Sequence, residues 1–167
     1  MLKSAILFAS VALFSSSATL AAPFTDTKNG YSLNAPQGWQ KLSVPGAATA
    51  YTDGVKGYTV SVIVQPAPNI VRLEGAVKKA FLDGAFGSLK AAALKGGATT
   101  VTRTDTTLGG QPALSAQYTL KDGNTYQMLL TAVNEKAYVL VLTAAKADFA
   151  KQQVLYGTVK SSFKINK

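Results

Sequence analysis

The stretch Ala137-Tyr-Val-Leu-Val-Leu-Thr143 decides which class of fold this sequence can adopt. Successive side chains of a β-strand point to opposite faces of the sheet. Both faces of this strand would be apolar, with Tyr138, Leu140 and Leu142 on one side and Val139 and Val141 on the other. The pattern therefore predicts a central strand that is covered on both sides.

The same alternation recurs on both sides of this stretch, separated by turn-forming residues. Residues 58–64 follow the strand period, with Tyr58, Val60, Val62 and Val64 on one face and Thr59, Ser61 and Ile63 on the other. The turn Asp53-Gly54 before them indicates a hairpin with residues 48–52. Threonine and charged residues fill 99–107, which is typical of a sheet edge. Two further strands, 113–120 and 125–133, flank the strong hairpin turn Asp122-Gly123-Asn124.

Two segments carry the 3.6-residue period of an amphipathic helix. The first covers about residues 71–94 and ends at Gly96-Gly97, and the pair Gly84 and Gly87 favours a kink or break in its middle. The second covers about residues 147–162. The residues expected to be buried are Leu73, Val77, Phe81, Phe86, Leu89 and Ala93 in the first helix and Ala150, Val154, Leu155, Val159 and Phe163 in the second.

These elements predict an α+β fold for one compact domain. We expect an antiparallel sheet of about six to seven strands, flanked by one long central helix and a C-terminal helix, so that the layers form an α-β-α sandwich. No internal repeat and no low-complexity linker divides the chain.

Residues 1–22 have the three-part pattern of a secretory signal peptide. Lys3 supplies the positive start, no charge occurs from Ser4 to Leu20, and small residues follow. We expect cleavage after Ala21 or Ala22, which leaves residues 23–167 as the mature domain with no transmembrane span. The periplasm is the expected location, with release outside the cell as the alternative, because the signal peptide directs only the first crossing.

The net charge of the chain is +9, and it remains +8 after removal of Lys3. An exported, lysine-rich chain with few arginines is a poor match for a nucleic-acid-binding protein. We interpret most of the lysines as solvated surface. A positive field could also attract an anionic envelope lipid, a polysaccharide or an acidic partner, and the residues predicted to form such an anion-attracting surface are Lys78, Lys79, Lys160 and Lys164.

The chain contains no histidine and no cysteine. Disulfides, histidine-based triads, cysteine nucleophiles and the usual zinc sites are therefore excluded. The eight acidic residues are spread singly, so no catalytic, metal-binding or cofactor-binding residue is assigned. A catalytic pair that forms only in the folded chain, from lysine or carboxylate side chains, stays open.

The segment Asn29 to Leu42 holds the only tryptophan, Trp39, after a proline-glycine turn. One interpretation is that its ring covers an end of the sheet, because a packed tryptophan buries a large apolar area. The other is a ligand or partner surface, which would be formed by Trp39, Tyr31, Tyr51 and Tyr58.

This segment, with its succession Tyr31-Ser-Leu-Asn-Ala-Pro-Gln-Gly-Trp39, resembles the N-terminal signature of the PsbP/DcrB-like superfamily. The resemblance continues through Leu108-Gly-Gly-Gln-Pro-Ala113, the central strand 137–143 and the ending Ser162-Phe-Lys-Ile165, and thus covers nearly the whole mature chain. It implies a small, often exported α-β-α domain that serves as an accessory or binding protein without a shared catalytic set. The lipidated cysteine of DcrB-type lipoproteins is absent.

Three functions remain, and they predict different surfaces. An exported accessory protein that docks a protein partner, by a sheet face or the groove beside a helix, requires a shallow apolar patch. A carrier or sensor of a small apolar or anionic envelope molecule requires an aromatic-lined pocket of about 300–1,000 Å³. An enzyme requires at least two ionisable groups that converge in one cleft with displaced pKa values.

Overall fold

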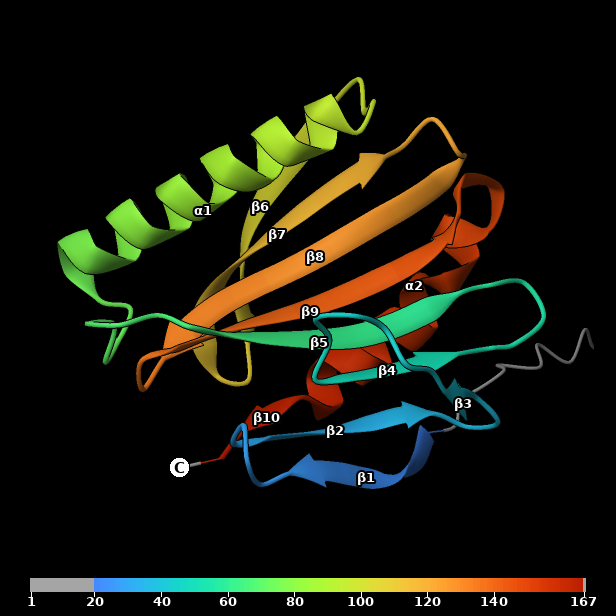
Figure 1. The fold of residues 1–167 in the computed structure, drawn as a ribbon, viewed down its shortest axis with the longest axis horizontal. Helices are drawn as coiled ribbons and strands as arrows, with labels where there is room; N and C mark the ends of the chain where they lie inside the picture. Colours follow the sequence, from blue (N-terminus) through green and yellow to red (C-terminus); the bar gives the residue numbers. More distant parts are fainter. Residues whose placement is uncertain (1–19, 167) are drawn as a thin grey trace, which may run out of the picture.

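The computed structural model describes residues 20–166, which form two antiparallel sheets and two helices (Figure 1). The larger sheet has seven strands in the order β3-β4-β5-β9-β8-β7-β6, and the smaller has three in the order β1-β2-β10. The α+β class, the antiparallel sheet and its two helices confirm the prediction. The elements are β1 (Leu20–Asp26), β2 (Tyr31–Pro36), β3 (Gln40–Lys41), β4 (Thr49–Thr52), β5 (Thr59–Pro66), α1 (Gly75–Lys95), β6 (Val101–Leu108), β7 (Gln111–Thr119), β8 (Asn124–Val133), β9 (Lys136–Ala145), α2 (Lys146–Ser162) and β10 (Lys164–Ile165).

The doubly apolar strand β9 is the middle strand of the larger sheet, as predicted. On one face Leu140 is fully buried between its cross-strand partners Val62 of β5 and Leu129 of β8. On the other face Val141 is 9% exposed. Helix α1 packs over β6 and β7, so the prediction that this helix covers the second face of the central strand is wrong. The threonine-rich strand β6 lies at a sheet edge, and the hairpins predicted at Asp53-Gly54 and at residues 122–124 join β4 to β5 and β7 to β8.

The two helices cover opposite faces of the larger sheet. Helix α1 packs over β6 and β7, and helix α2 lies between the strands β8 and β9 and the strand β2 of the smaller sheet. In Figure 1, α1 runs along one border of the large sheet, while α2 and the smaller sheet lie on the other side. We call the two faces the α1 side and the α2 side. A separate apolar cluster is buried on each side.

The three-stranded sheet is a feature that the sequence analysis did not predict. Strand β2 pairs with β1 on one side and with the two-residue strand β10 on the other, so it never joins the larger sheet. A strand of two residues carries no measurable alternation. Strand β1 overlaps the expected signal-peptide cleavage site, so its residues carry the pattern of a cleavage region instead of a strand.

The predicted apolar faces of the two helices are confirmed in part: Leu73, Ala93, Val159 and Phe163 are buried and Phe81, Phe86, Leu89 and Leu155 are half-buried, whereas Val77, Ala150 and Val154 are exposed. Val77 is 47% exposed on α1 and Val154 is 69% exposed on α2, whereas Leu82, Phe149 and Tyr156 are buried. The large aromatic rings of α2 bury more apolar area than valine does, and they decide which face turns inward. Helix α1 is continuous from Gly75 to Lys95, so the predicted break at its central glycines is wrong.

Residues 1–19 of the predicted signal peptide lie outside the described residues. Leu20 to Ala22 belong to β1, ahead of a register shift that ends at Pro23. Within residues 20–166, neither helix is both long enough and apolar enough to cross a bilayer.

Candidate functional site

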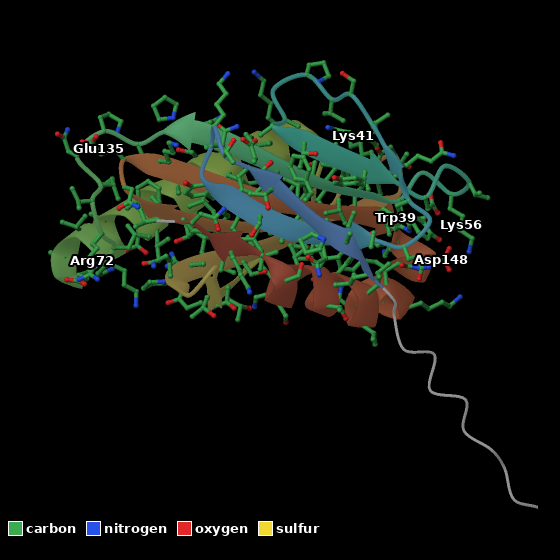
Figure 2. All side chains as sticks on the ribbon, turned by 90° about the horizontal axis from the view of Figure 1, so that it is seen from below. Trp39, Lys41, Lys56, Arg72, Glu135 and Asp148 are labelled. Atoms are coloured by element: carbon green, nitrogen blue, oxygen red, sulfur yellow. The ribbon has the colours of Figure 1, made fainter. Side chains whose placement is uncertain are left out.

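Trp39 sits in a tight turn between β2 and β3. Its backbone N–H donates to the carbonyl oxygen of Pro36 at 3.2 Å, and Gly38 between them has φ of +80°, a left-handed conformation that glycine adopts without a steric penalty. The half-buried ring packs against the α2-side core. Figure 2 shows Trp39 at the same end of the molecule as Lys56 and Asp148.

Of the three tyrosines predicted to accompany Trp39, only one reaches the surface. Tyr31 is fully buried and stacks on Phe163, with ring centroids 5.6 Å apart, and burial raises the pKa of its phenol. Tyr58 is 2% exposed. Tyr51 is half-buried on β4 and meets the ring of Phe24 edge-on at 6.4 Å. The proposed aromatic surface therefore reduces to Trp39 and Tyr51.

Tyr58 forms a contact that sequence reasoning missed. Its hydroxyl donates a hydrogen bond of 2.6 Å to Oδ2 of Asp148 at the start of α2, and Lys151 pairs with Oδ1 of the same carboxylate at 3.1 Å. The Tyr58 bond lowers the pKa of Asp148, and the same bond raises the pKa of Tyr58 to about 12. The two residues are 90 positions apart, so no local motif could have revealed the pair.

Replacing Tyr58 by phenylalanine is expected to raise the pKa of Asp148, as measured by NMR titration of its side-chain carboxyl. A carboxyl with a lowered folded pKa stabilises the fold above its unfolded pKa, and this stabilisation is lost as the pH falls through the folded value. Conversely, a tyrosine with a raised pKa stabilises the fold below pH 10 and loses this effect as the pH rises from 10 to about 12. The variant Tyr58→Phe should therefore show less loss of stability than the wild type over that alkaline interval.

The variant Tyr118→Phe is the matched control, because its hydroxyl faces Sδ of Met128 at 3.4 Å instead of a carboxylate. It should leave the pKa of Asp148 unchanged. An Asp148 pKa that is the same in the wild type and in Tyr58→Phe would show that the hydrogen bond does not hold in solution.

The structure does not bring the four predicted anion-attracting lysines together. Lys78 and Lys79 lie on α1, and Lys79 pairs with Asp83 at 2.6 Å. Lys160 lies on α2, on the opposite side of the sheet, and donates to Oγ1 of Thr106 at 2.6 Å. Lys164 is exposed on β10. The four lysines therefore lie on three different elements and do not form one surface.

Ionisable side chains do converge beside α1, where a shallow hollow of about 390 Å³ is lined by charged residues. Arg103 pairs with Asp83 at 2.7 Å and with Asp105 at 3.2 Å. Hydrogen bonds from Lys79 and Arg103 lower the pKa of Asp83, and the bond to Asp83 raises the pKa of Arg103. General acid–base catalysis favours a pKa near the working pH, whereas these shifts keep both groups charged, which indicates a structural ion-pair network.

The best-formed hollows of the described surface differ from an aromatic-lined ligand pocket. These hollows, of about 330 to 410 Å³, are shallow and open, and Phe149 is the one aromatic side chain among the residues that line them. Residues 20–166 contain no group of three or more carboxylates close enough to share a metal ion.

An apolar part of the large sheet is left open on the α1 side. Helix α1 packs over β6 and β7, and in Figure 1 the strands β8, β9 and β5 continue beyond it. In this region the cross-strand partners of Val141 are the half-buried Ser61 and Met128. We call this area the open sheet face and define it by its residues Ser61, Ile63, Tyr126, Met128 and Val141.

Side chains of β7 contact the open sheet face along its border and hold its residues in place. The rings of Tyr118 and Tyr126 stack with centroids 5.4 Å apart and an interplanar angle of 12°, and the Tyr118 hydroxyl donates to Sδ of Met128. Partial burial raises the pKa of both phenols. The alternation in the sequence predicted the strands β5, β8 and β9. It could not show that α1 would leave part of their surface uncovered.

Comparison with known proteins identifies the family. Residues 19–165 match the family model of PsbP. The chain belongs to the PsbP family. This confirms the predicted superfamily, and no curated protein sequence is significantly similar to the chain.

Solved structures show the same fold as this PsbP-family chain at low sequence identity. The solution structure of cyanobacterial PsbP (CyanoP) from Synechocystis is 21% identical, covers 94% of this chain and 98% of its own, and superposes with a TM-score of 0.60. LpqN, which is involved in cell envelope biogenesis of Mycobacterium tuberculosis, is 16% identical over 92% of this chain and 88% of its own, with a TM-score of 0.56. A protein from Bacteroides thetaiotaomicron is 11% identical over 87% of this chain and 48% of its own, with a TM-score of 0.59.

Proposed function

We propose that this PsbP-family protein is an exported, non-catalytic accessory protein of the bacterial envelope that docks a protein partner. The observation that carries the proposal is the open sheet face, where the half-buried side chains of Ile63 and Met128 lie beside the largely buried Val141 on paired strands. A partly exposed apolar patch of this kind is typical of a protein interaction site.

Two further observations support an envelope role. The sequence begins with the pattern of a signal peptide, in which Lys3 precedes an uncharged run to Leu20. LpqN, which shares the fold, is involved in cell envelope biogenesis of Mycobacterium tuberculosis.

The alternative functions have weaker support. A carrier of a small apolar or anionic molecule would enclose its ligand in a pocket of aromatic and apolar side chains, and the shallow hollows described above offer Phe149 alone as an aromatic lining. An enzyme based on lysine or carboxylate chemistry would use groups with a pKa near neutrality. The clustered Asp83 and Arg103 are instead shifted away from it.

Site-specific photo-crosslinking in the native cell tests the docking surface. A photoreactive benzoylphenylalanine at position 61, in the open sheet face, is expected to capture one defined protein. The same residue at position 104, which is exposed on the edge strand β6, serves as the matched control and should not capture that protein. Equal capture at both positions, or no capture at position 61, would contradict docking at this face.

Charge substitution then tests whether the captured complex depends on the same surface. Ser61→Arg should weaken the complex by about tenfold or more, since it places an unpaired charge in an apolar contact. Thr104→Arg changes the net charge equally and should leave the affinity unchanged. Circular dichroism of both variants separates a lost contact from a lost fold.

A further inference from the structure

Four chain segments that are distant in sequence are linked by successive contacts towards one end of the large sheet. In Figure 1 the β7–β8 turn, the start of α2 and the β4–β5 loop lie towards the right, and the C-terminus of α1 lies above them. The C-terminus of α1 contacts the β7–β8 turn, where Gly97 approaches the side chain of Lys121 so closely that a Cβ atom would lie 2.9 Å from it. The same turn contacts the start of α2, since the N–H of Lys146 donates to the Gly123 carbonyl at 2.9 Å. The bond between Tyr58 and Asp148 joins α2 to the end of the β4–β5 loop.

Each of these segments contributes an exposed lysine to this end of the molecule. We call the set the basic end, and it comprises Lys56, Lys95, Lys121 and Lys146. Among the ion pairs of the described residues, none involves any of these four ammonium groups. This set shares no member with the predicted anion-attracting lysines Lys78, Lys79, Lys160 and Lys164.

The carboxylates at this end are bound within the protein. Asp53 accepts backbone hydrogen bonds from its own loop, Asp122 accepts two from Asn124, and Asp148 accepts from Tyr58 and Lys151. The three aspartates offset part of the positive charge, so that with Lys151 counted the five lysines leave a local net charge of +2. Because these carboxylates are hydrogen-bonded within the protein, the charged groups that the basic end presents to a partner are mainly ammonium groups.

Apolar side chains project among these lysines. Val55, at the tip of the β4–β5 loop, is 88% exposed, and Leu94, in the last turn of α1, is 43% exposed. Asp53 holds the loop that carries Val55, because its Oδ1 accepts from the N–H groups of Val55, Lys56 and Tyr58 at 3.1 to 3.3 Å. Val55 is therefore exposed on a loop whose conformation is fixed by hydrogen bonds.

We propose that the basic end binds the surface of an anionic phospholipid bilayer. A lipid surface is the partner that fits both features at once, because its phosphates attract lysines while its acyl boundary accepts exposed apolar side chains. A small soluble anion would leave Val55 and Leu94 without a role, and a nucleic acid would favour arginine and stacked aromatic rings. In this orientation the open sheet face, which belongs to the flat side of the sheet, remains accessible to a protein partner.

Co-sedimentation with vesicles tests this proposal on the exported and processed protein. We expect binding to vesicles that contain phosphatidylglycerol, weak binding to vesicles of phosphatidylcholine alone, and a decrease in binding as salt screens the charges. The triple variant Lys56→Gln, Lys121→Gln, Lys146→Gln should weaken binding by about fivefold per lysine, or about a hundredfold in total. The fluorescence of Trp39, the only tryptophan of the chain, gives a second readout.

Matched variants make the outcome specific. The triple variant Lys28→Gln, Lys78→Gln, Lys164→Gln has the same net charge and should bind nearly as well as the wild type. Val55→Ser should weaken binding, and Val154→Ser, which alters a valine that is 69% exposed on α2, should not. Equal losses in the two triple variants, equal binding to both vesicle types, or no binding to either would overturn the proposal, while the test of partner docking at position 61 would stand unaffected.

Discussion

Replacing Phe163 by alanine is expected to lower the free energy of unfolding by about 3–5 kcal/mol. Phe163 is 2% exposed at the end of α2. Its ring stacks on Tyr31 of the smaller sheet at 5.6 Å and meets Tyr138 of β9 edge-on at 6.3 Å. One ring therefore joins α2, the smaller sheet and the larger sheet, and its removal leaves a cavity at the point where the three meet.

Urea denaturation followed by circular dichroism measures this loss, with Val154→Ala as the control. Val154 lies on the same helix and is 69% exposed, so its truncation should change the stability by no more than about 0.5 kcal/mol. Hydrogen exchange adds a local readout, because the amides of β2 should lose protection more than those of β8. A cost for Phe163→Ala as small as that for Val154→Ala would contradict the central packing role of this ring.

The correct predictions concern residues whose environment follows from the local alternation of side chains between the two faces of a strand. The alternation of 137–143 predicted a strand with two apolar faces, and the structure confirms it as the middle strand. The threonine-rich segment 99–107 likewise predicted an edge, where β6 lies. In both segments the strand period alone determines which side chains share a face.

The features that the sequence did not predict depend on contacts between distant segments. The bond between Tyr58 and Asp148 spans 90 positions. The basic end forms only because the turn at Lys121, the start of α2 at Lys146 and the β4–β5 loop at Lys56 reach the same end of the sheet. The smaller sheet includes β10, whose two residues are too few to show a period.

Replacing Leu140 by alanine is expected to lower the free energy of unfolding by about 2–5 kcal/mol. Leu140 is fully buried on the α2 side of the middle strand, and its cross-strand partners Val62 and Leu129 are 0% and 1% exposed. The surrounding strands are fixed by their ladders on both sides, so the cavity cannot collapse easily. Denaturation curves at equilibrium measure the loss.

The neighbouring substitution Val141→Ala tests the opposite face of the same strand. Val141 is buried by its neighbours within the sheet, yet α1 packs over β6 and β7 instead of over this residue. Solvent can fill the space left by its truncation, so the cost should be well below that of Leu140→Ala. Addition of the partner captured at position 61 should then stabilise the wild type more than Val141→Ala, since ligand binding to the native state adds to its stability. Equal costs for the two truncations would mean that the α1 side of β9 is as closed as the α2 side, and the open sheet face would lose its role as a docking surface.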